Sequence, residues 1–182
     1  MKSGTAAGTE IEDNIISKNS IQARFDGINL NFTATCGTYQ TASRNILSGN
    51  IISGVLDANG VWDLVDHAIY PQKSTLTQIT GNVIRRSING VNFQQCPQEN
   101  TVLDNQVEAT GTGIIFNGSG IASKNMIQGA TTGISADWST YTALTDNMFS
   151  LPSTSRRYYL EPSRVYHSTI RNNCDIGGNC EP

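Results

Sequence analysis

Residues 103–134 read LDNQVEATGTGIIFNGSGIASKNMIQGATTGI, and this stretch contains one pattern twice. In both copies an apolar residue follows an Asn by two positions, and a Gly follows the same Asn by eight positions and precedes Ile. The full pattern, with Ile or Val after the glycine, occurs four times along the chain. It is anchored by Asn19, Asn82, Asn105 and Asn125, with glycines at Gly27, Gly90, Gly113 and Gly133. Self-similarity of this kind is typical of solenoid proteins.

Three further copies of the pattern are less regular. At Asn50 the glycine comes two residues late, at Gly60, and Asn147 has no matching glycine. A degenerate copy fits about equally badly at Asn172 and at Asn173. The chain therefore has room for about six to seven repeats.

Each repeat has three apolar positions that are fixed relative to its Asn. They lie two residues after the Asn (Ile21, Ile52, Ile84, Val107, Ile127, Phe149), three before it (Ile16, Leu47, Ile79, Val102, Ala122, Leu144) and directly after the glycine (Ile28, Val61, Val91, Ile114, Ile134). Three apolar positions suit three short strands per coil, and stacked coils bury such side chains as continuous columns. The Asn tolerates a left-handed turn conformation and can bond to the Asn above and below.

These patterns predict the fold class. We expect an all-β protein, a right-handed parallel β-helix solenoid of about six to seven coils with lateral loop insertions. The β-helix is expected over 1–150. Residues 151–182 are expected to form an irregular C-terminal extension or cap, with room for one degenerate coil.

Composition excludes several classes of function. Only 15% of the residues are charged, the net charge is −3, and the longest basic cluster is Arg156-Arg157, so no nucleic-acid partner is expected. No apolar run approaches the roughly 18 residues that cross a bilayer, so no membrane insertion is expected. The opening MKSGTAAGTE lacks the apolar stretch of a signal peptide. This favours either a cytoplasmic protein or a piece cut from a longer exported or virion chain.

The repeat resembles that of right-handed parallel β-helix repeat proteins, the pectate-lyase-like superfold that includes phage tailspike-type adhesins. The resemblance covers about residues 10–150 and rests on the Asn-anchored pattern. It implies polysaccharide lyases, hydrolases and epimerases, together with virion adhesins that bind or cut surface glycans. No catalytic motif of these proteins carries over residue by residue, and the fold alone does not supply a function.

Lateral insertions are the main functional signal in the sequence. The first two coils each carry roughly ten extra residues, which we place at 31–43 and 61–77, on one side of the stack; 135–142 and 150–168 are expected on the same side. All six tyrosines and both tryptophans lie in these segments: Tyr39, Trp62, Tyr70, Trp138, Tyr141, Tyr158, Tyr159 and Tyr166. Tyr and Trp combine a flat apolar face with a polar group, which suits sugar rings. We predict glycan binding by Tyr39, Trp62, Tyr70, Trp138 and Tyr141, with coverage of the stack or a subunit interface as the alternatives.

The second insertion contains WDLVDHAIY, residues 62–70. Asp63, Asp66 and His67 are the candidate catalytic residues, because two carboxylates can divide acid and base roles and a base beside them can abstract a proton. Lys73 lies nearby in the sequence. The alternative is a solvated loop, or an Asp that caps a short helical turn. His167 is expected at the surface, and no metal site or cofactor is expected, because the two histidines are 100 residues apart.

The four cysteines are Cys36, Cys96, Cys174 and Cys180. Cys174 and Cys180 could close a small loop around Gly177-Gly178 and help to cap an open end of the stack, while free thiols are the alternative.

Three functions fit these observations. The first is a glycan-recognising β-helix domain of a phage tail spike or similar surface adhesin, with a polysaccharide or surface glycan as partner and assembly as a homotrimer. The second is a fragment of a polysaccharide lyase or hydrolase of the pectate-lyase-like group. The third is a purely structural shaft. The mass of the protein in solution separates the first two functions, because a tail spike is expected to be a trimer and a secreted lyase a monomer.

Overall fold

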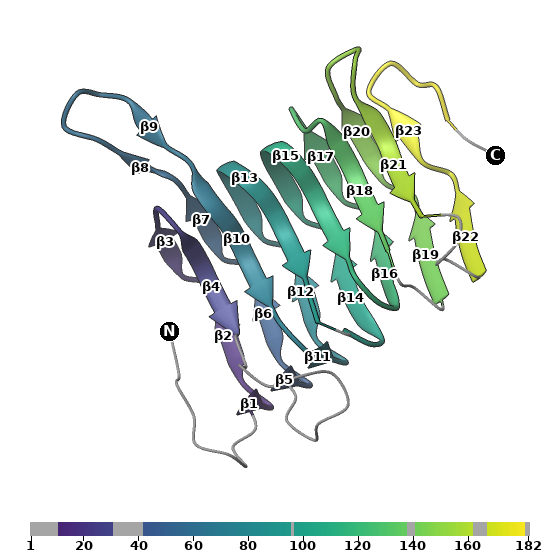
Figure 1. Cartoon of the computed structure of the whole chain (residues 1–182), viewed down its shortest axis with the longest axis horizontal. Helices are drawn as coiled ribbons and strands as arrows, with labels where there is room; N and C mark the ends of the chain where they lie inside the picture. Colours follow the sequence, from purple (N-terminus) through teal and green to yellow (C-terminus); the bar gives the residue numbers. More distant parts are fainter. Residues whose placement is uncertain (1–10, 31–41, 96, 138–140, 162–166, 181–182) are drawn as a thin grey trace.

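The computed structural model describes residues 11–30, 42–95, 97–137, 141–161 and 167–180, which form strands and the turns between them. The coils lie side by side from the N-terminal to the C-terminal end of the chain (Figure 1). The strands of this part of the chain pair in parallel, with the exception of β8 and β9. It contains no helix of the length and apolarity that crossing a membrane requires. The predicted all-β parallel β-helix solenoid is therefore confirmed.

One face of the coils is a seven-stranded parallel sheet. Its strands are β2 (Ile15–Ser17), β6 (Ile46–Ser48), β12 (Gln78–Thr80), β14 (Asn100–Leu103), β16 (Gly120–Ser123), β19 (Tyr141–Thr145) and β22 (His167–Arg171). A three-stranded sheet precedes this face in the first coils, made of β1 (Ile11–Glu12), β5 (Ala42–Ser43) and β11 (Ser74–Thr75).

The other two faces belong to one eleven-stranded sheet, because the long strands β13 (Val83–Phe93) and β15 (Gln106–Phe116) contribute to both. The register between them shifts between Ile84 and Asn89, where the chain passes from one face to the next. Their first halves align with β3 (Ser20–Gln22), β7 (Ile51–Ser53), β17 (Met126–Gln128), β20 (Met148–Ser150) and β23 (Cys174–Asp175). Their second halves align with β4 (Asp26–Leu30), β10 (Val65–Pro71), β18 (Thr132–Ala136) and β21 (Arg156–Leu160).

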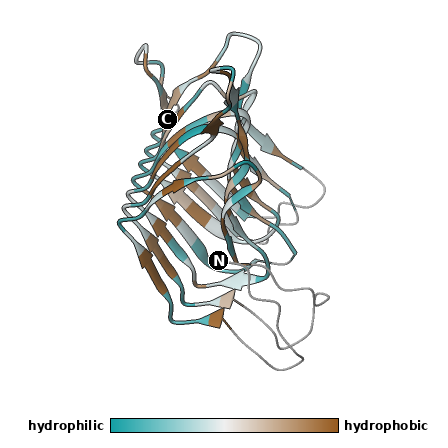
Figure 2. Ribbon diagram, turned by 90° about the vertical axis from the view of Figure 1, so that its left-hand side faces the viewer, coloured by the Kyte–Doolittle hydropathy of each residue, from teal (hydrophilic) through white to brown (hydrophobic). Residues whose placement is uncertain are grey.

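The first two predicted apolar columns are confirmed. The strand register aligns Ile21, Ile52, Ile84, Val107, Ile127 and Phe149 in one column and Ile16, Leu47, Ile79, Val102, Ala122 and Leu144 in another. All are buried except Ile21 and Ile16, which lie at the N-terminal end of the stack and are partly buried. Apolar residues accordingly form bands across the stacked strands (Figure 2).

The third predicted column is wrong in the second coil. Val61 is 60% exposed, and Ile69 takes the core position instead, paired with Ile28 on one side and Val91 on the other. Ala68, which is fully buried, therefore occupies the place that glycine holds in other coils, because its single methyl group fits there. Gly60 is not the glycine of this coil.

An insertion explains this error. Between β7 and β10 the chain makes an antiparallel hairpin of β8 (Val55–Leu56) and β9 (Trp62–Asp63), which projects from the stack at the left of Figure 1. The extra residues of the second coil thus come before its long strand, whereas the sequence pattern placed them after it. Most of the predicted insertion 61–77 is regular strand, and 31–41 lies outside the described residues.

A ladder of asparagine side chains joins the coils, as predicted. Each side-chain amide nitrogen donates to the side-chain oxygen of the Asn in the next coil at 2.9–3.0 Å. The ladder consists of Asn19, Asn50, Asn82, Asn105, Asn125, Asn147 and Asn173. The seventh coil is therefore anchored by Asn173, and the other candidate, Asn172, precedes it.

The left-handed residue of each turn is the one before the ladder Asn, and the prediction that the Asn itself adopts this conformation is wrong. Lys18, Asp104, Lys124 and Asp146 have φ angles of 55–56°. This arrangement turns the following Asn side chain into the coil, where it can bond to its neighbours. A short polar residue is not required at the left-handed position itself.

A second ladder lies five residues earlier in the first coils, and the sequence reasoning missed it. The Asn14 side chain donates to Asn45 at 3.1 Å, and the Thr77 backbone N–H donates to Asn100 Oδ1 at 2.9 Å. The residue before Asn100 is Glu99, which again has a left-handed φ of 54°.

Candidate functional site

The predicted catalytic residues lie on the β8–β9 hairpin and at the start of β10. Asp63 forms an ion pair with Arg24, whose Nε is 3.1 Å from Asp63 Oδ2. Asp66 and His67 lie together, with 3.6 Å between Asp66 Oδ2 and His67 Nδ1. The structure thus brings two of the three residues together and gives the third a partner of its own.

Asp26 is a closer partner of His67, and sequence reasoning missed it. The two residues occupy the same register position in β4 and β10, and His67 Nδ1 is 3.2 Å from Asp26 Oδ1. Asn29 donates from Nδ2 to the other carboxylate oxygen of Asp26. The Asp26 carboxylate therefore engages the Nδ1 atom of His67 and orients the imidazole ring. In functional sites, such a contact at one ring nitrogen decides the role of the other. Aligning Ala68 with the glycine of the first coil would have revealed this pair.

Tyr70 connects His67 to the next corner of the coil. The two rings are stacked, with centroids 4.6 Å apart and an angle of 15° between the planes. The Tyr70 hydroxyl donates to Gln94 Oε1 at 2.8 Å. Burial raises the pKa of Tyr70, and the charges of Asp26 and Asp66 add to this effect, while a hydrogen bond with Gln72 opposes it.

Trp62 does not offer both faces of its indole. The Arg86 guanidinium lies over the ring, 3.6 Å from the ring centroid, in a cation–π contact. Lys73 is 3% exposed, and burial lowers the pKa of its amine. Tyr39 and Trp138 lie outside the described residues.

A groove runs across four successive coils on another side of the stack. It is lined by residues 94–95, 97–99, 117–121, 137, 141–143 and 167–169, which belong to the corners before β14, β16, β19 and β22 and to the first residues of the last three strands. Three inter-strand spacings of about 4.8 Å give it a run of roughly 14 Å. Sequence reasoning missed most of this lining, because each coil supplies only a few residues and these share no motif.

The groove lies where the second ladder ends. Asn100 pairs in register with Gly120, and Gly120 with Thr142, so the side chain at this corner changes from an amide to none and then to a hydroxyl. A Cβ atom at Gly120 would lie 2.3 Å from the Phe116 ring, which explains the glycine. The Tyr141 N–H donates to Ser119 Oγ at 3.3 Å and fixes the neighbouring corner.

Tyr141 and His167 form a stacked pair of rings in the groove. They are partners in the register of β19 and β22, their centroids are 5.2 Å apart, and their planes differ by 15°. Tyr141 is 64% exposed. Of the predicted glycan-binding residues, Tyr141 lines the groove. Tyr70 does not line it, but its hydroxyl donates to the lining residue Gln94. His167, expected only to be at the surface, completes the pair.

The residues that the structure describes contain no group of three or more His, Cys, Asp and Glu side chains placed to hold a metal ion. His67, Asp26 and Asp66 lie close together, but both carboxylates contact the same ring nitrogen, Nδ1 of His67. Soft sulfur donors occur in register at Met126 and Met148. The next residue of that column, Cys174, is bonded to another cysteine.

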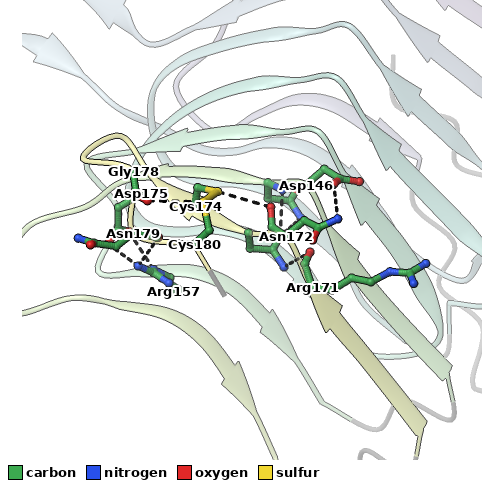
Figure 3. Close-up of a disulfide and its surroundings, with 11 residues drawn as sticks. Asp146, Arg157, Arg171, Asn172, Cys174, Asp175, Gly178, Asn179 and Cys180 are labelled. Atoms are coloured by element: carbon green, nitrogen blue, oxygen red, sulfur yellow. Dashed lines mark hydrogen bonds and ion pairs between the residues drawn. A yellow bond between two sulfur atoms is a disulfide. The ribbon is translucent and has the colours of Figure 1, made fainter. Parts of the chain in front are cut away.

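A disulfide between Cys174 and Cys180 closes a loop at the C-terminal end of the stack (Figure 3). Of the two alternatives that the sequence left open, a disulfide and free thiols, the structure has the disulfide. Arg157 Nε donates to Asp175 Oδ1 at 2.8 Å, and a second guanidinium nitrogen contacts the other carboxylate oxygen. These contacts tie the last short strand, β23, to β21. The other two cysteines, Cys36 and Cys96, lie outside the described residues.

Comparison with known proteins places the chain in a family. No curated protein and no solved structure matches it significantly. A family model described as "Periplasmic copper-binding protein (NosD)" matches residues 12–179, which is most of the chain. This family consists of right-handed parallel β-helix proteins, which confirms the resemblance at the level of the fold. The chain belongs to the NosD family of right-handed parallel β-helix proteins.

Proposed function

We propose that this chain is a glycan-recognising β-helix domain that binds an extended oligosaccharide in the groove. The observation that carries the proposal is the stacked, exposed pair of Tyr141 and His167 inside a groove that crosses four coils. An aromatic ring offers a flat apolar face to a sugar ring and a polar group to its hydroxyls. Because the two rings come from adjacent coils and stack on each other, a ligand that runs along the stack would meet their edges and the face of each ring that is turned away from the other.

The remaining lining supports the same ligand. Gln94, Gln98 and Asn117 supply carboxamides, each of which can donate and accept hydrogen bonds. Sugar hydroxyls also donate and accept, so amide side chains match them in either direction. The lining residues lie on paired β-strands or at the corners next to them, and binding residues on such a scaffold lose little conformational entropy.

The setting of the domain follows from two further observations. A disulfide at its C-terminal end suits an oxidising compartment, and the description of its family names the periplasm. We therefore place the protein outside the cytoplasm. We still predict that the domain is part of a tail spike or similar surface adhesin and that it assembles as a homotrimer. The mass of the protein in solution checks this prediction.

A glycan array tests the proposal. Tyr141→Ala removes one ring of the pair and should abolish binding, whereas Phe25→Ala, which removes a ring that is 79% exposed outside the groove, should retain it. Trp62→Ala, on the hairpin, tests the patch predicted from the sequence. Unchanged melting of all three variants would show that binding alone was altered. A wild-type protein that binds no glycan, or a Tyr141→Ala protein that binds as well as wild type, contradicts the proposal.

The described residues do not fit the copper centre that the family description suggests. Copper in proteins prefers imidazole and sulfur ligands in groups of three or four. The two methionines in register, Met126 and Met148, have no third soft donor in their column, because Cys174 is in a disulfide. No step of the proposed function involves copper.

Cleavage of a glycan is a second candidate function, favoured by the contact between His67 and Asp26. A carboxylate that holds Nδ1 leaves Nε2 as the ring nitrogen that could exchange a proton with a substrate. Incubation with polysaccharides and a reducing-end assay tests this function. Activity that is lost in His67→Gln and retained in Tyr141→Ala would favour it over recognition in the groove.

A further inference from the structure

The described residues that line the groove carry more negative than positive charge. They include two carboxylates, Glu99 and Asp137, and no Lys or Arg. The His167 imidazole is the only group among them that can become positive. Three described arginines of the C-terminal coils lie outside this lining: Arg156 is over the Tyr159 ring, Arg157 is paired with Asp175, and Arg171 follows the lining residue Thr169 at the end of β22.

We propose that the groove selects uncharged glycans, including N-acetylated ones, and rejects polyuronates and other polyanionic glycans. This inference rests on the proposed function and assigns its substrate class. Proteins that recognise carboxylates or sulfates do so with Arg and Lys, whose charge and donors compensate the desolvated anion. A polyuronate in this groove would bring carboxylates toward Glu99, and the described lining residues include no Lys or Arg to compensate them. Like charges at close range give effective discrimination against a ligand.

Glu99 is the residue that we expect to set this specificity. Its side chain is exposed, and it projects from a left-handed turn position (φ 54°) at the corner where the groove begins. Carboxylate oxygens accept hydrogen bonds from sugar hydroxyls and acetamido N–H groups, and such charge-assisted bonds are strong. The same oxygens can only repel a uronate. One side chain therefore both attracts the uncharged ligand and excludes the charged one.

The chain offers a matched control. Asp104 is another exposed carboxylate in a left-handed turn position (φ 55°), on a corner that does not line the groove. Lysine is tolerated at this kind of position, since Lys18 and Lys124 have φ angles of 56° and 55°. Glu99→Lys and Asp104→Lys therefore change the net charge equally and are both expected to fold.

The experiment measures binding of wild type and both variants to oligosaccharides of equal length. The panel contains uncharged β-glucan, xylan and N-acetylated chitin fragments beside oligogalacturonate and oligomannuronate. Wild type and Asp104→Lys should bind at least one uncharged member and bind the uronates at least about ten-fold more weakly. Glu99→Lys should reduce the ratio of uncharged-glycan affinity to uronate affinity by about ten-fold. Added salt should make this effect of the substitution smaller.

Three results overturn the inference, and they differ in what they imply. Wild type that binds the uronates as tightly as the uncharged members, with the ratio unchanged in Glu99→Lys, overturns the charge rule and leaves glycan recognition standing. Wild type that binds no member of the panel and no glycan on an array overturns the proposed function, and with it the substrate class. Equal effects of Glu99→Lys and Asp104→Lys show that net charge, and not the groove, decides the preference.

Discussion

His67 and Asp26 are 41 residues apart in the sequence, yet they occupy the same register position on neighbouring coils, with 3.2 Å between Nδ1 and Oδ1. In a parallel β-helix, register decides which polar side chains meet, because each strand lies directly beside its counterpart in the next coil. The position before the long strand's glycine or alanine therefore forms a column of its own. Asp26 and His67 are its first two members, and Asn89 is the next.

Asp26→Ala should destabilise the protein by about 1–3 kcal/mol, because His67 Nδ1 and Asn29 Nδ2 lose their acceptor in a mostly buried place. Urea denaturation measures this change in the free energy of unfolding. Asp66→Ala is the control, since Asp66 is 49% exposed and 3.6 Å from His67, and it should be close to neutral. Equal losses of unfolding free energy in the two variants would mean that both carboxylates, and not Asp26 alone, stabilise the protein through His67.

Asn105→Leu should cost about 3 kcal/mol or more. The Asn105 side chain is 1% exposed, donates to Ile79 O, Leu103 O and Asn125 Oδ1, and accepts from Asn82. Leucine leaves several buried donors and acceptors without partners, each at a cost of roughly 1–3 kcal/mol. Asn59→Leu, at the exposed tip of the hairpin, is the control in the same denaturation experiment. Melting of Asn105→Leu at the wild-type temperature would mean that the ladder adds little stability.

Much of the fold could be predicted because its determinants are local. An Asn, an apolar residue two positions later and another three positions earlier recur in the first six coils, since each coil must bond to and pack against the next. The second coil was misread because its hairpin shifts the spacing and because Ala68 replaces the expected glycine. A small residue satisfies that position, so a search for glycine alone chose Gly60.

The candidate site could be predicted only in part. Tyr141 was found by its residue type, because exposed aromatic residues in insertions suggest recognition. Its partner His167 and the corner residue Glu99 were not, since they come from different coils and no spacing links them. The groove crosses the corners at Asn100, Gly120 and Thr142, and only the register puts these corners side by side.

Gly90→Ala should destabilise the stack by about 1–3 kcal/mol through overpacking. A Cβ atom at Gly90 would lie 2.4 Å from the backbone oxygen of Gly113 and 2.4 Å from a methyl group of Val107. Neither neighbour can move freely, because the first belongs to the backbone of the next coil and the second is 1% exposed in the core. Gly177→Ala, where nothing lies within 4 Å, is the control and should leave thermal melting unchanged. Equal melting of both variants would show that the coils can separate locally at little cost.

The C-terminal end should lose stability in acid through Asp175. A hydrogen bond from Arg157 holds the pKa of the Asp175 carboxyl below its ordinary value of 3.8, and the positive charge of Arg157 acts in the same direction. A depressed folded-state pKa means that the unfolded chain takes up the proton first. The contribution is therefore fully present well above pH 3.8 and is lost as the pH falls through the lower, folded-state value. Wild type should unfold at a higher urea concentration than Asp175→Asn at neutral pH, and the difference should shrink in acid. Adding Asp175→Asn to Arg157→Gln should change the pH profile little, because the partner is already gone. A difference between wild type and Asp175→Asn that stays constant from neutral pH to the acid limit would rule out this pair as the source of acid sensitivity at the C-terminal end.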